Sequence, residues 1–179
     1  MRRREFVKLV GGAVTTRSVL RFAGPVLSLS TVDLLAAEHD AIPVAVADFD
    51  YDDTSGEVAD QRTEHAKRMK AFADLLRERL AEEGKYKVLR LNCAAAICSG
   101  DSIGADDLVA SAQRADARLL IYGSIHKMST LIQWGTVRVV DVREKQLLLN
   151  RLFSFRGDND EAFRKAAKFI GETLQSVTP

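Results

Sequence analysis

Aspartate side chains are concentrated directly after an apolar run, and they are the residues best suited to chemistry in this sequence. Asp48, Asp50, Asp52 and Asp53 follow residues 42–47, which read IPVAVA. Carboxylates grouped in this way can hold a divalent cation, transfer protons, or accept hydrogen bonds from the first turn of a helix. We expect a ligand or partner to bind at these aspartates, and we assign no catalytic residue, metal ligand or cofactor.

The segment at residues 50–54 (DYDDT) resembles the D-x-D-x-T motif of haloacid-dehalogenase phosphatases. In that family the first Asp attacks phosphorus and the second acts as acid and base around Mg²⁺, so the resemblance implies these roles for Asp50 and Asp52. The family's late acidic pair follows a further strand, whereas Asp106 and Asp107 precede the third predicted strand. A small Mg²⁺-dependent phosphohydrolase is the alternative function. A cation held without catalysis and a solvated, helix-capping loop are the other interpretations.

His126 and Lys127 are the second group of candidate site residues. They directly follow a largely apolar segment, residues 118–124. A histidine near its unperturbed pKa titrates in the physiological range, so His126 with Lys127 could transfer protons or bind an anion. A purely structural histidine is the alternative. The sequence shows no nucleophile and base motif, glycine-rich phosphate loop or zinc signature.

Hydrophobic periodicity predicts the elements that position these residues. Residues 42–47 are typical of a strand buried on both faces. Apolar residues at three- and four-residue steps predict an amphipathic helix over residues 60–83, which Gly84 ends. The other predicted elements are a strand at 86–91, a short helix at 106–114, a strand at 118–124, a hairpin of 131–142 and 147–155 around Arg143–Gln146, and a helix that begins at Asp158 with Asp158 and Glu161 as a capping box.

These elements predict one α/β domain, residues 38–179, with the order β-α-β-α-β-β-β-α. Right-handed crossovers make the first three strands parallel and give a mixed five-stranded sheet of order 2-1-3-4-5, counted along the chain. The first and third strands are then neighbours, and the ends of both enclose a crevice. Asp48 and Asp50 should point to the same side of their strand, with His126 and Lys127 as the nearest opposite charges.

The two cysteines, Cys93 and Cys98, lie together in the predicted loop 92–104. In an oxidising compartment such a pair forms a disulfide that stiffens the loop. Their spacing differs from the C-x-x-C of redox-active pairs, and the loop has no His or further Cys to complete a metal site. We expect a disulfide, with free thiols as the alternative.

Charge and composition narrow the class of partner. The chain is 46% hydrophobic and 28% charged, as is typical of a soluble globular protein. Its formal charge of +1 arises from residues 1–37, which carry six basic and two acidic groups and leave 20 Lys and Arg against 23 Asp and Glu elsewhere. The sequence has no basic stripe, so we expect no nucleic acid partner.

Residues 2–8 (RRREFVK) precede a short and weakly apolar run, LVGGAV. This segment resembles the twin-arginine signal of bacterial export, with Arg3, Arg4 and Phe6 at motif positions, and the resemblance implies a signal peptide over residues 1–37 that is cleaved near Ala37. A basic N-terminal tail is the alternative. No stretch reaches the roughly 18 to 20 apolar residues that span a bilayer. We expect a periplasmic protein without a transmembrane segment.

Three segments carry a resemblance to a known family: 44–51 (VAVADFDY), 115–129 (ADARLLIYGSIHKMS) and 137–142 (VRVVDV). Over residues 42–175 the chain resembles a family of uncharacterised secreted proteobacterial proteins. More distantly it is similar to the N-terminal domain of TolB and to the CsgG-like domains of envelope assembly proteins. The resemblance implies an α/β accessory or binding module for a cell-envelope protein or small ligand, with no enzymatic activity to transfer.

Overall fold

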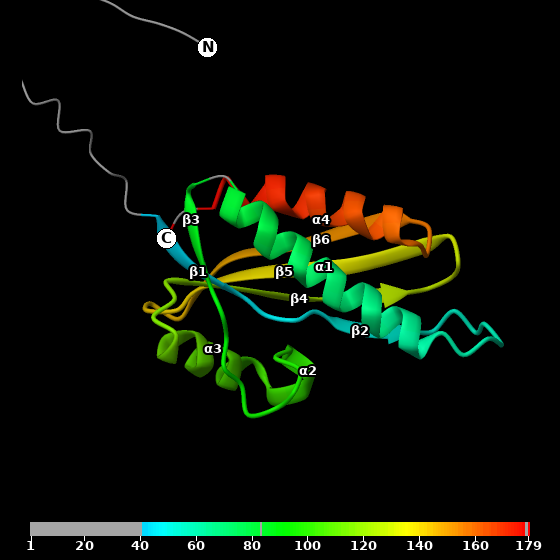
Figure 1. Ribbon diagram of the computed structural model, residues 1–179, viewed down its shortest axis with the longest axis horizontal. Helices are drawn as coiled ribbons and strands as arrows, with labels where there is room; N and C mark the ends of the chain where they lie inside the picture. The colour runs from blue at the N-terminus through cyan, green and yellow to red at the C-terminus, as the bar shows by residue number, and fades with distance from the viewer. Residues whose placement is uncertain (1–40, 83, 178) are drawn as a thin grey trace, which may run out of the picture. The chain divides into compact units, whose positions relative to one another are not determined.

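A mixed six-stranded sheet organises the chain in the computed structural model, which describes residues 41–82, 84–177 and 179 (Figure 1). All of these residues belong to the unit Glu38–Pro179. In chain order the strands are β1 (Ile42–Val46), β2 (Asp50–Asp53), β3 (Tyr86–Leu89), β4 (Leu119–Lys127), β5 (Ile132–Asp141) and β6 (Gln146–Arg156).

The hydrogen-bonded order is β3-β1-β4-β5-β6, and β2 pairs with β4 beyond the end of β1. The pairs β1–β3, β1–β4 and β2–β4 are parallel, whereas β4–β5 and β5–β6 are antiparallel. This confirms the predicted α/β class and the order of the five predicted strands. The sixth strand is a correction, because we expected residues 50–53 to be a tail and they pair instead with residues 124–127.

A one-residue bulge separates β1 from β2. Val46 lies opposite Ile121 and Asp50 lies opposite Ser124, so four steps along β1 and β2 match three steps along β4. An extra residue in one strand reverses the alternation of side chains beyond it. The expectation that Asp48 and Asp50 share one side of a regular strand is therefore wrong. Asp48 lies in the bulge, outside the regular alternation of β2. The Asp50 side chain lies in β2 and points to the face of the sheet opposite to that of Tyr51.

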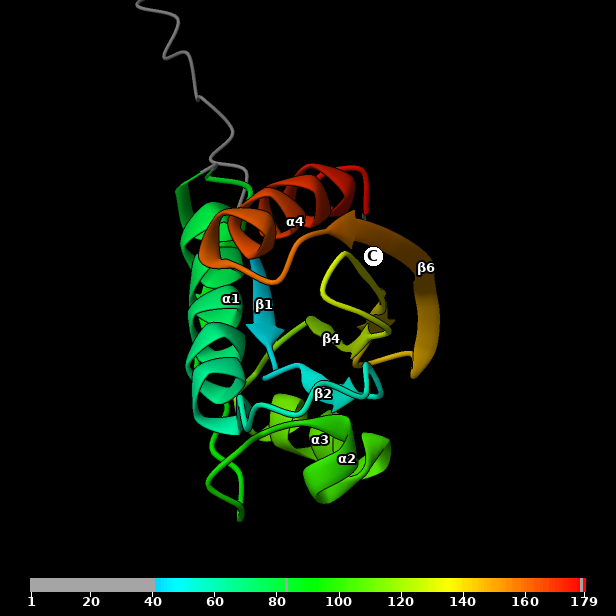
Figure 2. The same ribbon diagram turned by 90° about the vertical axis from the view of Figure 1, so that its right-hand side faces the viewer.

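Helices cover both faces of the sheet (Figures 1 and 2). On one face lie α1 (Arg62–Glu82) and α4 (Asp160–Leu174), side by side. On the other face lie α2 (Gly100–Ile103) and α3 (Ala105–Arg114). The α1 bounds confirm the helix that periodicity predicts over 60–83 to within two residues at its start.

The larger of two hydrophobic cores lies between the sheet and the pair α1 and α4. Phe72 contacts Phe49 and Phe163 edge to face, with ring centroids 5.1 and 6.2 Å apart. Each such buried ring stabilises the fold by about 1.5–3 kcal/mol. The second core, under α3, is built mainly from small and aliphatic residues: Ala45, Ala47, Leu108, Ala112, Ala117, Leu120 and Val142.

The start of α4 differs from its sequence prediction, whereas the hairpin of β5 and β6 agrees with it. The capping box of Asp158 and Glu161 is wrong, because Asn159 caps α4 by accepting a hydrogen bond from Ala162 N at 3.0 Å. The predicted hairpin of β5 and β6 is confirmed. Its turn has no Gly, and Lys145 adopts a φ of 52° while the buried Asp141 accepts hydrogen bonds from the turn backbone.

Candidate functional site

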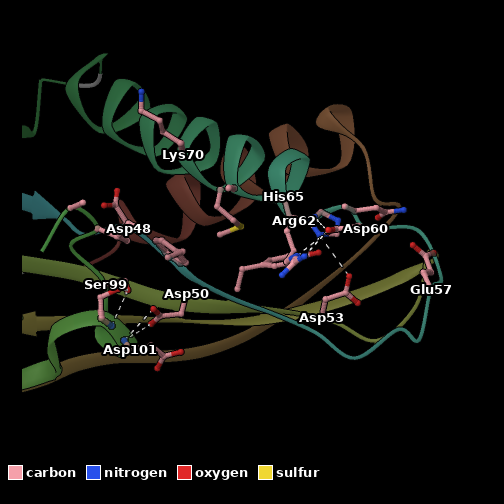
Figure 3. Close-up of a pocket in the computed structure, with 18 of the residues that line it drawn as sticks. Asp48, Asp50, Asp53, Glu57, Asp60, Arg62, His65, Lys70, Ser99 and Asp101 are labelled. Carbon is pink, nitrogen blue, oxygen red and sulfur yellow. Dashed lines mark hydrogen bonds and ion pairs between the residues drawn. The ribbon is translucent and has the colours of Figure 1, made fainter.

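A groove of about 890 Å³ lies between α1 and the loop that leads into α2, with β2 along its length (Figure 3). Its lining mixes charged side chains with apolar ones. The carboxylates are Asp48, Asp50, Asp53, Glu57, Asp60 and Asp101, the Lys and Arg side chains are Arg62, Lys70 and Arg77, and the apolar side chains include Phe49, Ala66, Met69, Ala96 and Ile97.

Asp48 ties three elements together at one end of this groove. Its Oδ1 accepts a hydrogen bond from Arg77 Nη2 of α1 at 3.0 Å, and its Oδ2 accepts one from Cys98 N at 3.0 Å. The backbone N of Asp48 also donates to Cys98 O at 2.8 Å. Arg77 in turn donates to Val46 O at 2.9 Å. Asp48 therefore fixes the disulfide loop and α1 against the bulge.

Asp50 holds the start of α2. Its carboxylate oxygens accept from Asp101 N at 3.1 and 3.2 Å, and a β-carbon added at Gly100 would lie 3.1 Å from Oδ2. Burial raises the pKa of Asp50 above its ordinary value, although hydrogen bonds from Ser99 and Asp101 act in the opposite direction. The position of Asp50 matches the helix-capping interpretation of the acidic segment.

Asp52 and His126 form a separate, more exposed pair on the face that carries α2 and α3. His126 Nδ1 lies 2.9 Å from Asp52 Oδ2, and His126 Nε2 lies 2.8 Å from Thr54 Oγ1. The His126 ring lies 5.2 Å from the ring of Trp134. These side chains face a second, smaller groove of about 540 Å³, lined also by Tyr122 and Arg138.

Lys127 points to the opposite face of the sheet and is fully buried. Its Nζ lies 2.8 Å from Asp158 Oδ2, Glu57 Oε2 and Gln61 Oε1, and 3.5 Å from Asp53 Oδ2. Burial alone would lower the pKa of Lys127, but the hydrogen bonds with Asp158 and Glu57 outweigh it and raise the pKa. The structure therefore separates His126 and Lys127, which we expected in one crevice.

His65 and Arg68 of α1 complete what we call the buried ion cluster, namely Asp53, Glu57, His65, Arg68, Lys127 and Asp158. His65 Nε2 lies 3.0 Å from Asp158 Oδ2, and Arg68 Nη1 lies 2.6 Å from Asp158 Oδ1. Sequence reasoning missed this cluster. One signal was present, because His65 precedes Met69, Phe72 and Leu76 at the helical spacing of the buried stripe.

The cysteine prediction is confirmed. Cys93 and Cys98 form a disulfide, with Cα atoms 5.7 Å apart. The ring closes the loop before α2, so that Ile97, which is 55% exposed, lines the groove. Within the residues that the structure describes, no group of three or more His, Cys, Asp or Glu side chains is arranged to hold a metal ion.

Comparison with known families places this chain. The DUF3280 model, described as "Protein of unknown function (DUF2380)", matches residues 43–173, and the chain belongs to that family. No curated protein matches the sequence significantly.

Several solved structures are similar to this chain at low sequence identity. TolB from Acinetobacter baumannii is 17% identical, with a TM-score of 0.49 over 75% of this chain and 27% of TolB, so the chain spans about a quarter of that protein. The PelC dodecamer from Paraburkholderia phytofirmans is 14% identical, with a TM-score of 0.47 over 75% of this chain and 85% of PelC. Lipoprotein GNA1162 from Neisseria meningitidis is 14% identical, with a TM-score of 0.42 over 76% of this chain and 99% of that one.

Proposed function

We propose that this member of the DUF3280 family is an exported binding module that holds a cell-envelope protein in the groove between α1 and the disulfide loop. The observation that carries the proposal is the groove itself. It is large, it combines apolar side chains with charged ones, and a disulfide and Asp48 hold one wall in place. Concave sites with a few fixed polar groups in an apolar lining are the usual form of binding sites.

The aspartates support binding over phosphoryl transfer. A nucleophilic aspartate must present a free, ionised oxygen to its substrate. Both oxygens of Asp50 accept from the backbone of α2, and its pKa is raised by burial. Asp52, which would be the acid and base, pairs with His126 on a different groove. These carboxylates act as structural acceptors that shape the walls of the binding site.

Export rests on the disulfide and on the N-terminal sequence. A disulfide persists in oxidising compartments such as the periplasm. The twin-arginine motif and the cleavage point near Ala37 lie outside the described residues. Across the described part of the chain, none of the helices has both the length and the apolar character to cross a membrane.

Replacement of both Arg3 and Arg4 by Lys tests the export step. We expect uncleaved precursor to accumulate in the cytoplasm, because the twin-arginine route requires this pair. Cell fractionation and immunoblotting measure the distribution. An unchanged periplasmic yield would contradict the assignment of the route.

Site-specific photo-crosslinking tests the binding function. A photo-reactive residue at Ile97, which lines the groove, should give a discrete adduct with an envelope protein in living cells. The matched control is Phe169, an exposed apolar residue on the outer side of α4 that is 45% exposed and lies outside the groove. Mass spectrometry identifies the adduct. No adduct at Ile97, or the same adducts at both positions, would contradict the proposed function.

A further inference from the structure

We propose that the groove receives an extended, basic segment of the partner, which adds to the sheet as a strand along the outer edge of β2. This inference rests on the proposed function and specifies the chemistry of its partner. It depends on three observations: an unpaired strand edge, the space beside it, and the charge around it.

The outer edge of β2 carries unpaired backbone groups. Within the part of the chain that the structure describes, β4 is the one strand that pairs with β2. Thr54 N donates to Lys127 O at 3.0 Å, and this bond shows which alternate residues of β2 direct their backbone groups toward β4. In a parallel pair, alternate residues direct both N–H and C=O to the same neighbour. Asp52 therefore faces β4, and Tyr51 and Asp53 direct their backbone N–H and C=O groups away from it, along the groove.

A strand already occupies the equivalent position beside β1. There β3 pairs in parallel with Ile42 to Ala45 and ends at Leu89. The hydrogen bond from Asp48 N to Cys98 O covers the bulge. Beyond the bulge, the groove occupies the space beside β2 where a further strand could lie. Neighbouring strands lie about 4.8 Å apart, so a volume of about 890 Å³ accommodates a short added strand. An added segment would continue the line of β3.

The charged side chains that line the groove determine which kind of partner segment can bind in it. Six carboxylates and three Lys or Arg side chains line the groove. Asp60 pairs with Arg62, Asp48 pairs with Arg77, and Asp53 and Glu57 lie beside the buried Lys127, so Asp50 and Asp101 carry the acidic charge that these ion pairs leave. Acidic residues on an open edge repel acidic strands and a second copy of the same edge, which is a common protection against aggregation. They attract a strand with Lys or Arg, so a basic segment is the occupant.

Side-chain alternation adds a second constraint. In an added strand, successive residues point to opposite faces of the sheet. One set would contact Ala66 and Met69 of α1, and the other would contact Ile97 and the start of α2. These apolar contacts, combined with the carboxylates, favour a segment in which Lys or Arg alternates with β-branched residues. This mode of recognition draws its affinity from backbone hydrogen bonds and its specificity from alternate side chains.

Backbone-modified peptides test the geometry directly. The probe is a fluorescent peptide of about six residues, the usual length of a strand, in which Lys alternates with Val. Two derivatives carry N-methyl groups on all Lys or on all Val residues, so each loses the hydrogen-bond donors of one edge only. In fluorescence anisotropy with the mature protein, we expect one derivative to bind at least tenfold more weakly than the parent and the other to bind like the parent. The same peptide with Glu in place of Lys should not bind.

Two protein variants locate the peptide. Asp101 lines the groove, and among the described residues its carboxylate forms no ion pair with a Lys, Arg or His side chain, so Asp101→Lys should weaken binding of the Lys-Val peptide several-fold. The matched control is Asp106→Lys on the first turn of α3, outside the groove, which should leave binding unchanged. Circular dichroism confirms that both variants fold.

The outcomes separate this inference from the proposed function. Absence of binding by the parent peptide, equal binding by both N-methylated derivatives, or equal effects of the two Asp variants would overturn strand addition. If the crosslink at Ile97 still identifies an envelope protein, the proposed function stands without this mode of recognition. If that crosslink fails while the peptide binds as expected, the proposed function is overturned and the peptide-binding edge stands as an isolated property.

Discussion

Two neighbouring pairs on the same two strands have opposite surroundings. Asp52 lies opposite His126, and Asp53 lies opposite Lys127. The first pair lies on the face that carries α2 and α3, where the Asp52 side chain is 70% exposed. The second lies under α1 and α4, where Lys127 is fully buried among Glu57, Asp53 and Asp158. The residue types are similar, and burial decides what each pair does.

The comparison of these two pairs distinguishes charged side chains that hold the fold together from charged side chains that a partner can reach. A buried charge that loses its partners costs several kcal/mol, because water cannot replace them, whereas an exposed pair contributes about 0–1 kcal/mol. The buried ion cluster therefore fixes β2, β4, α1 and the loop before α1 as one unit. Asp101, which lines the groove, remains available to a partner.

Lys127→Met should have the largest effect. The substitution keeps most of the side-chain volume but leaves the partly buried Glu57 and Asp158 without their ammonium partner, so we expect a loss of about 3–5 kcal/mol in the free energy of unfolding. Urea denaturation measures the change. A loss below about 1 kcal/mol would show that the cluster relaxes into solvent and would remove the contrast between the two pairs.

Asp158→Asn should have an intermediate and pH-dependent effect. Burial alone would raise the pKa of Asp158, but hydrogen bonds from Lys127 and His65 and the charge of Arg68 lower it. A carboxyl whose pKa is lowered on folding contributes stability that is fully present above its unfolded pKa of about 3.9 and is lost as the pH falls through the folded value. The variant should therefore be less stable at pH 7 and should lose less stability on acidification than the wild type.

Measurement of the free energy of unfolding between pH 7 and pH 2 for both proteins tests this prediction. Parallel pH profiles would contradict it, because they would mean that the charge of Asp158 contributes equally in the folded and unfolded chains. Asp106→Asn is a suitable control, since Asp106 lies on the first turn of α3, outside the cluster.

His126→Gln and Asp52→Asn should have the smallest effects. The pair is partly exposed, and its hydrogen bonds can be replaced by water, so each change should alter the free energy of unfolding by no more than about 1 kcal/mol. The same denaturation experiment measures both. A loss as large as that of Lys127→Met would mean that the exposed pair is structural too.

The sequence predicts the strand order, the long amphipathic helix and the disulfide because each depends on local pattern or on close spacing. Apolar residues at helical steps identify α1 within two residues at its start. Cys93 and Cys98 need only a short loop to meet. Strand alternation also places the side chains of His126 and Lys127 on opposite faces of the sheet, so the sequence pattern itself argues against one crevice that holds both.

The bulge and the buried ion cluster could not be predicted in the same way. The extra residue between Val46 and Asp50 becomes visible only when β1 and β2 are aligned with β4, which is far away in the sequence. Asp158 and Asn159 are both competent helix caps, and the choice between them depends on Lys127 and His65, which attract Asp158 into the cluster. Such roles are set by tertiary contacts and not by local preference.

Residue-resolved hydrogen exchange of β2 tests the central claim, that its outer edge is open and available. The amides of Asp52 and Thr54 face β4 and should be protected, whereas those of Tyr51 and Asp53 face the groove and should exchange close to the unprotected rate. Addition of the Lys-Val peptide should slow exchange at Tyr51 and Asp53 alone. Equal protection of all four amides in the free protein would contradict the account, because the edge would then already be covered.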